Sequence, residues 1–250
     1  MPAYLPTLWS PTDTLPALSQ EEIHLWDINL ATTPEVTNLL STSLSSKELE
    51  YAHRRPEKLR SRYIASKGYL RHLLGKYLGI PPGEIRYIFG ELGKPALSPE
   101  FKSGLSFNLS DCGNKGLLAV AYGREIGVDL EQLPRNVNER AIAQKLFSPS
   151  EANALNAAEA EKLNESFLAC WTRKEAWGKA IGRGIHYPMK NTPLCNQLSE
   201  PELQYCFAND NWLLRQFRPD SHSVACLVGS GVDWKMSCFR WTLMTATGAQ

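Results

Sequence analysis

With 250 residues, of which 43% are hydrophobic and 21% charged, the chain is long enough for one large domain or two smaller ones. Its 27 basic and 26 acidic residues give a net charge of +1, which favours neither nucleic acid nor a membrane surface as a partner. The sequence contains no apolar stretch of roughly eighteen residues and no signal-like N-terminus, so we predict no membrane span.

The first half of the chain predicts strands around one long helix. Residues 1–20 are rich in Pro, Ser and Thr and are expected to form an irregular lead-in, followed by an alternating, strand-like segment at 22–30. The spacing of Ser and Glu in 45–48 is that of a capping box and predicts a short helix. A longer helix with apolar and basic stripes is predicted from Pro56 to Gly79. Strands are then expected at about 85–89, 105–109, 117–122 and 126–130.

The second half is predicted to repeat this plan. Helices are predicted at 138–145, from 148 onward, and at 160–181, where Gly182 or Gly184 ends the long helix. Strands are expected at about 203–207, 212–217, 223–228 and 236–243. The pattern indicates an α+β fold of two similar subdomains, residues 21–122 and 123–250, each a long helix packed on a mainly antiparallel sheet.

The cysteines give no sign of a metal site or a disulfide framework. There are six of them, without a C-x-x-C pair and without clustering around the five histidines. We therefore expect reduced thiols in a cytoplasmic protein.

Two carboxylates, Asp129 and Glu131, close an apolar strand. Residues i and i+2 of a strand point to the same face, so both side chains are expected to lie together. Adjacent like charges are unfavourable without a compensating cation, and Mg²⁺ prefers oxygen ligands of this kind. Taken alone, the pair is a weak signal, and a solvated strand end is its simpler interpretation.

Glu175 and Lys179 lie one helical turn apart, a spacing that also fits a surface salt bridge worth about 0.2–0.5 kcal/mol. The flanking Trp171 and Trp177 indicate partial burial, where a carboxylate and an ammonium need partners. Glu151 stands where an acid is favourable in the first turn of a helix.

Three further positions carry possible contacts to phosphate or nucleotide. Lys94, between a glycine and Pro95, is expected in a turn and also fits an approach to a nucleotide. Ser110 ends a strand in a polar loop, where its hydroxyl is able to cap the backbone or bind phosphate. The glycines at 182–184 follow a helix, whereas phosphate loops precede one, so this segment is not a phosphate loop.

In their order, these segments resemble the Sfp-type 4′-phosphopantetheinyl transferases. The matching segments are GKP at 93–95, FNLS at 107–110, IGVDLE at 126–131, FSPSE at 147–151 and WTRKEAWGKAIGRG at 171–184. The resemblance covers about residues 45–190 and implies a pseudo-twofold monomer with its active site between the halves. It also implies that the protein moves 4′-phosphopantetheine from coenzyme A to a serine of an apo-acyl, peptidyl or polyketide carrier protein.

The resemblance further implies a role for each matching residue. Asp129, Glu131 and Glu175 are expected to hold Mg²⁺, with Mn²⁺ possible, and Lys179 to neutralise a phosphate oxygen. The carrier serine needs a base, for which Glu151 is the candidate and Glu175 the competitor. The coenzyme A contacts implied are Lys94 and Pro95 at the adenine, Ser110 at a phosphate, and Lys47 with Arg62 or Arg71 at the 3′-phosphate.

Asp111 departs from the family pattern, which commonly has histidine after the serine of this loop to assist the coenzyme's phosphate. An anion at this position turns away, binds a cation or weakens coenzyme A binding. Asp111 therefore leaves open the alternative that the protein is a non-catalytic module that binds coenzyme A or a carrier protein. A metal-dependent phosphodiesterase is a more distant alternative, since it needs the acids but no lysine at an adenine site.

Overall fold

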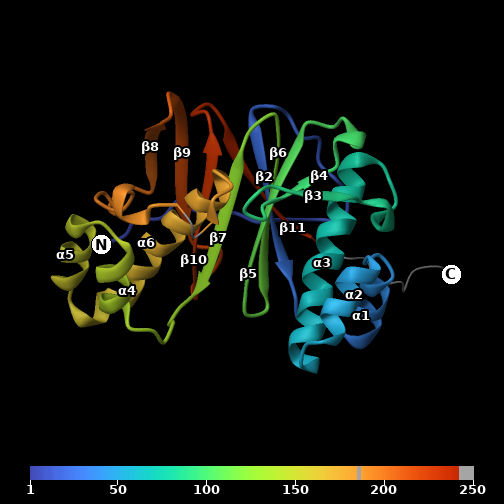
Figure 1. Ribbon diagram of the computed structural model, residues 1–250, viewed down its shortest axis with the longest axis horizontal. Helices are drawn as coiled ribbons and strands as arrows, with labels where there is room; N and C mark the ends of the chain where they lie inside the picture. The colour runs from blue at the N-terminus through green and yellow to red at the C-terminus, as the bar shows by residue number, and fades with distance from the viewer. Residues whose placement is uncertain (185–186, 242–250) are drawn as a thin grey trace.

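The computed structural model describes residues 1–184 and 187–241, which form two β-sheets with helices on their outer sides (Figure 1). The α+β class predicted from the sequence is confirmed. The helices are α1 (Pro34–Ser41), α2 (Ser46–His53), α3 (Glu57–Leu78), α4 (Glu139–Leu146), α5 (Pro149–Asn156) and α6 (Ala160–Ala180). The strands are β1 (Ser10–Thr12), β2 (Glu22–Asn29), β3 (Tyr87–Phe89), β4 (Pro95–Leu97), β5 (Leu105–Cys112), β6 (Lys115–Tyr122), β7 (Ile126–Gln132), β8 (Glu202–Phe207), β9 (Asp210–Phe217), β10 (Ser223–Ser230) and β11 (Lys235–Trp241).

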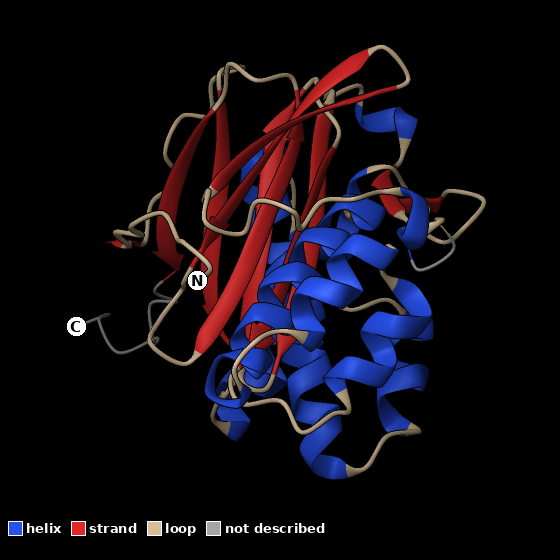
Figure 2. Cartoon of the chain, turned by 90° about the vertical axis from the view of Figure 1, so that its left-hand side faces the viewer, coloured by secondary structure: helices blue, strands red, loops and turns tan. Residues whose placement is uncertain are grey.

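The first sheet has the strand order β1-β11-β2-β6-β5, and the second has the order β7-β10-β9-β8. β11 runs parallel to both β1 and β2, and the remaining pairs in the two sheets are antiparallel. β3 and β4 form a separate hairpin. Helices α1–α3 lie beside the first sheet and α4–α6 beside the second, and Figure 2 shows the helices gathered against the strands.

Both faces of the central strands are buried, which explains their nearly continuous apolar sequences. In β6, Leu117, Ala119 and Ala121 face the second sheet, whereas Leu118 and Val120 face α3. Successive side chains of a strand point to opposite faces, so a strand between two layers must be apolar at every position. The two sheets therefore pack face to face between two outer layers of helices.

The predicted helix boundaries agree closely with the structure because they rest on local capping chemistry. The capping boxes that begin α2 and α5 are both formed, by Ser45 with Glu48 and by Ser148 with Glu151. Gly79 has a φ of 67° and ends α3, as the left-handed conformation after a helix favours glycine. Three short elements, β1, β4 and α1, were not predicted from the sequence.

The last described strand lies in an unexpected position. β11 was expected to belong to the second subdomain, residues 123–250. It pairs instead with β2 of the first sheet, from Lys235 opposite Glu22 to Arg240 opposite Asp27. The first sheet thus combines strands from both ends of the chain. Residues 242–243 of the strand predicted there lie outside the described residues.

One expectation about the cysteines was wrong: Cys170 of α6 and Cys195 form a disulfide. The two residues are 25 positions apart, and nothing in their spacing distinguished them from the other four cysteines. Among the described helices none is long and apolar enough to cross a membrane.

Candidate active site

The candidate site forms where β7, β5 and α6 meet at the junction of the two sheets. In β7, the side chains of Val128 and Leu130 face the core between the sheets, so Asp129 and Glu131 point the other way. Gly127 permits α6 to approach closely, because a Cβ there would lie 2.1 Å from the carbonyl oxygen of Ala176.

Lys179 of α6 connects the three elements. Its Nζ donates to Asp129 Oδ1 at 2.6 Å, to Ser110 Oγ of β5 at 2.9 Å and to the carbonyl oxygen of Val128 at 3.1 Å. Ser110 Oγ donates to the same Asp129 Oδ1 at 3.0 Å. Lys179 is one-quarter exposed, so part of the ammonium group remains accessible to an anion.

Two carboxylate oxygens at this junction are buried without a hydrogen-bond donor. Within the described part of the chain, nothing donates to Asp129 Oδ2 or Glu175 Oε1. Burial, together with the negative charge of Asp129, raises the pKa of Glu175 from 4.5 to about 7. Burial and Asp129 also raise the pKa of Glu131. Buried acidic oxygens without a donor fit a hard divalent cation, which prefers oxygen ligands.

Glu131 has a cationic partner in the structure. Its Oε1 accepts a hydrogen bond from Nη1 of Arg135, which follows β7, and the two side chains form an ion pair. The Arg135 guanidinium also lies over the ring of Trp171, 5.7 Å from its centroid. Cys112 Sγ is 3.8 Å from the other oxygen of Glu131.

Three cavities with shared walls surround these residues. The central cavity has a volume of about 640 Å³ and is lined by Asp129, Glu131, Arg135 and Lys179, among others. It shares Lys179 and Leu109 with a second cavity of about 240 Å³. It shares Asp111 with a third cavity of about 330 Å³. A long ligand with several polar groups fits such a row of connected cavities.

The structure brings several predicted coenzyme A residues to these cavities. Lys94 and Pro95 line the second cavity, and Lys94 Nζ donates to the carbonyl oxygen of Ala180 at 2.7 Å and contacts Glu125 at 2.5 Å. Arg62 lines the third cavity.

Lys47 and Arg71 lie elsewhere. Lys47 is exposed on the first turn of α2 and lines none of the three cavities. Arg71 is buried, with its Nε 3.0 Å from Glu48 Oε2 and Nη1 3.0 Å from the carbonyl oxygen of Ile85. Its guanidinium therefore holds α2 and the segment after α3 together and is not free to bind a phosphate.

Asp111 also has a local partner, because Ser66 Oγ of α3 donates to its Oδ2 at 2.9 Å. This contact holds the carboxylate at the wall between the central and third cavities. The carboxylate is thus oriented toward α3 and still lines both cavities.

Glu151 does not reach the cluster of acids. Its carboxylate accepts from the backbone nitrogens of Ser148 and Cys195, each at 2.9 Å, and pairs with the buried Lys174 at 2.9 Å. Both side chains of the ion pair are fully buried. The carboxylate thus fixes the start of α5 and the segment around Cys195 to α6, and the first-turn interpretation of Glu151 describes it better than a role as base.

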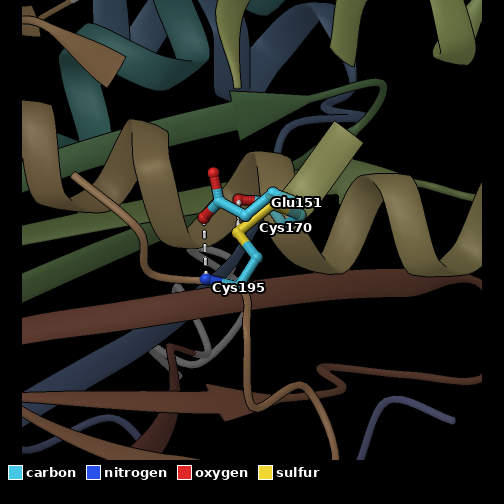
Figure 3. A group of neighbouring side chains, drawn as sticks. All are labelled: Glu151, Cys170 and Cys195. Atoms are coloured by element: carbon cyan, nitrogen blue, oxygen red, sulfur yellow. Dashed lines mark hydrogen bonds between the residues drawn. A yellow bond between two sulfur atoms is a disulfide. The ribbon is translucent and has the colours of Figure 1, made fainter. Parts of the chain in front are cut away.

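Figure 3 shows Glu151 beside the Cys170–Cys195 disulfide. Although these three side chains are close enough together to surround an ion, sulfur atoms joined in a disulfide are not thiolate ligands. The group therefore offers no metal site in this form. A larger cavity of about 780 Å³ beside Arg124 and Asp233 contains none of the predicted site residues, so the chemistry of the lining, not its size, identifies the site.

Sequence reasoning missed several residues of the site. Arg135 lies four positions after Glu131, beyond the strand, and only the fold turns it back toward the acids. Arg55 and Lys67 line the third cavity; Lys67 belongs to the basic stripe predicted for the long helix, whereas the signal for Arg55 was the general excess of basic residues between Lys47 and Lys76. Asn108, within the FNLS segment, accepts from the backbone nitrogen of Val128 at 2.8 Å and so joins β5 to β7.

Comparisons with known proteins agree on one family. A model of the 4′-phosphopantetheinyl transferase superfamily matches residues 125–227. The chain is 37% identical over 231 residues to the 4′-phosphopantetheinyl transferase HetI of Nostoc sp., a match that covers 91% of this chain and 95% of HetI. It is 37% identical over 123 residues to the 4′-phosphopantetheinyl transferase AcpT of Escherichia coli, covering 49% of this chain and 58% of AcpT. A 4′-phosphopantetheinyl transferase of Bacillus subtilis is 28% identical over 120 residues, covering 48% of this chain and 51% of that protein.

Proposed function

The chain belongs to the 4′-phosphopantetheinyl transferase superfamily, and we propose that it transfers 4′-phosphopantetheine from coenzyme A to a serine of an apo-carrier protein, releasing 3′,5′-ADP. Acyl carrier proteins and the carrier domains of polyketide or peptide synthesis are the proposed acceptors. The observation that carries the proposal is the ion pair of Lys179 with Asp129 at the central cavity, beside the half-buried Glu175, where Asp129 and Glu175 each keep one carboxylate oxygen without a donor among the described residues. We further propose that the enzyme acts in the cytoplasm as a monomer.

Asp129, Glu131 and Glu175 would hold a divalent cation, Mg²⁺ or Mn²⁺. The unpartnered Asp129 Oδ2 and Glu175 Oε1 support this assignment, since a buried carboxylate oxygen without a donor is costly unless a cation compensates it. When bound, the ion neutralises charge on the pyrophosphate of coenzyme A.

Coenzyme A would extend along the row of cavities. Lys94 and Pro95 would border the adenine, and Ser110 and Lys179 would contact phosphate oxygens. Arg62 is the proposed residue for the 3′-phosphate, because it lines the third cavity, whereas Arg71 is buried in another ion pair.

The chain's own residues would then promote transfer mainly by placing the reactants and neutralising charge. Lys179, held by three oxygen atoms, is oriented to stabilise negative charge on a phosphate. Glu175 is the proposed proton acceptor for the carrier serine, because its half-buried carboxylate lies beside Asp129 and Lys179 and keeps one oxygen without a donor among the described residues. Glu151 is saturated by other contacts and is not proposed for this role.

The two alternative functions predict different products. A module that only binds coenzyme A or a carrier protein has no need for Asp129, Glu131 and Lys179 at one cavity with Glu175 close by, so their convergence favours catalysis. A phosphodiesterase would hydrolyse coenzyme A without a carrier protein.

The test is intact-mass analysis of an apo-acyl carrier protein incubated with this protein, coenzyme A and Mg²⁺, with and without EDTA. We expect the carrier to gain one phosphopantetheine group only when metal is present. Asp129→Ala should abolish the gain while the protein stays folded, as checked by circular dichroism. Absence of the gain with acyl, polyketide and peptide carriers would reject the transferase, and loss of coenzyme A without a carrier would identify the phosphodiesterase.

A further inference from the structure

Arg135 is the one cation among the described residues that contacts a proposed metal ligand without being fixed by several partners. Its guanidinium contacts Glu131 and lies over the ring of Trp171. Its side chain is 39% exposed and lines the central cavity, whereas Glu131 is only 14% exposed.

The backbone of Arg135 is held firmly on both sides by α6. Its backbone nitrogen donates to Asn164 Oδ1 at 3.2 Å, and Asn164 Nδ2 donates to its carbonyl oxygen at 2.7 Å. The guanidinium is therefore able to leave Glu131 by rotation of the long side chain alone, without movement of the loop.

The charge balance of the cluster determines what a divalent cation must compete with at the three acids. Asp129, Glu131 and Glu175 face two cations, and Lys179 and Arg135 neutralise Asp129 and Glu131 respectively. An incoming divalent cation competes with both. Lys179 also donates to Ser110 and to the backbone of Val128, so it is held more strongly than Arg135.

We propose that Arg135 is the resident counter-ion of Glu131 in the metal-free protein, and that a divalent cation must displace its guanidinium to gain that carboxylate. Arg135 thus lowers the affinity of the site for metal. The inference rests on the metal site proposed above. It assigns to Arg135 a positioning role that acts through Glu131.

The experiment measures Mn²⁺ binding to the full chain, without coenzyme A or carrier, from the electron paramagnetic resonance signal of free Mn²⁺. Arg135→Gln should lower the Kd for Mn²⁺ by about two- to fivefold, the range expected for loss of a partly exposed ion pair. Arg218→Gln is the matched control, because Arg218 is similarly exposed at 30% and contacts Glu165 instead. Its Kd should equal that of the wild type.

Arg135→Lys keeps the positive charge and should bind Mn²⁺ like the wild type. An unchanged or higher Kd for Arg135→Gln overturns the inference, as does an equal gain in Arg135→Lys. Glu175→Gln separates this failure from failure of the metal site. If Glu175→Gln does not weaken Mn²⁺ binding, the proposed metal site itself is wrong.

Discussion

Replacement of Glu175 by glutamine should stabilise the metal-free protein, and should do so only at neutral and higher pH. Glutamine resembles the protonated carboxyl group but carries no charge. The folded protein raises the pKa of Glu175 from 4.5 to about 7, so folding disfavours the ionised form. The stability associated with the protonated group is complete below about pH 4.5 and is lost as the pH rises through about 7.

The size of the effect follows from this change. Each pKa unit corresponds to about 1.4 kcal/mol, so a rise from 4.5 to about 7 gives an upper bound of about 3.5 kcal/mol for the stabilisation by Glu175→Gln. Because Glu175 is partly exposed, screening by solvent reduces the expected gain to about 1–2 kcal/mol.

The assay is urea denaturation in EDTA at about pH 5 and about pH 8, which gives the free energy of unfolding for each protein. Glu175→Gln should exceed the wild type by about 1–2 kcal/mol at the higher pH and by about 0.5 kcal/mol or less at the lower pH. Glu100→Gln, at an exposed position, is the control. Its free energy of unfolding should differ from that of the wild type by the same small amount at both pH values. An equal gain for Glu175→Gln at both pH values, or a loss at the higher one, would refute the reasoning.

Three further predictions concern the fold and the coenzyme site. Gly127→Ala should lower the free energy of unfolding by about 3 kcal/mol or more, because the added Cβ would clash with Ala176, and an unchanged Tm would contradict this. Lys174→Met should lower the free energy of unfolding by about 3–5 kcal/mol, because it leaves the buried Glu151 carboxylate without its cation. Urea denaturation should show a smaller loss when both charges of the pair are removed than for Lys174→Met alone. Asp111→His should lower the KM for coenzyme A in the carrier assay, and an unchanged or higher value would remove this position from coenzyme A binding.

The sequence predicted those parts of the fold that depend on local chemistry. Capping boxes at Ser45 and Ser148 and the glycine at 79 are local signals, and the structure forms all three. The position of β11 depends instead on pairing with β2, more than two hundred residues away in sequence. No local sequence pattern predicts which distant strand will be the pairing partner.

The same distinction applies to the candidate site. Asp129 and Glu131 were predicted as neighbours because a strand repeats every two residues, and they share one cavity. Glu151 and Arg71 belong to motifs or stripes that look functional in the sequence, but each is buried in an ion pair that supports the fold. Burial and partner choice are tertiary properties, so sequence alone left both interpretations open.

The place of β11 has a consequence for how the protein is made. Because β11 lies between β1 and β2, the edge of β2 that pairs with β11 stays open until residues 235–241 have left the ribosome. Open strand edges attract other chains, so a nascent or truncated chain is prone to aggregate until the edge is covered. A cut between β6 and β7 would separate β2 from β11, and neither fragment would contain a complete first sheet. The two halves must therefore mature together.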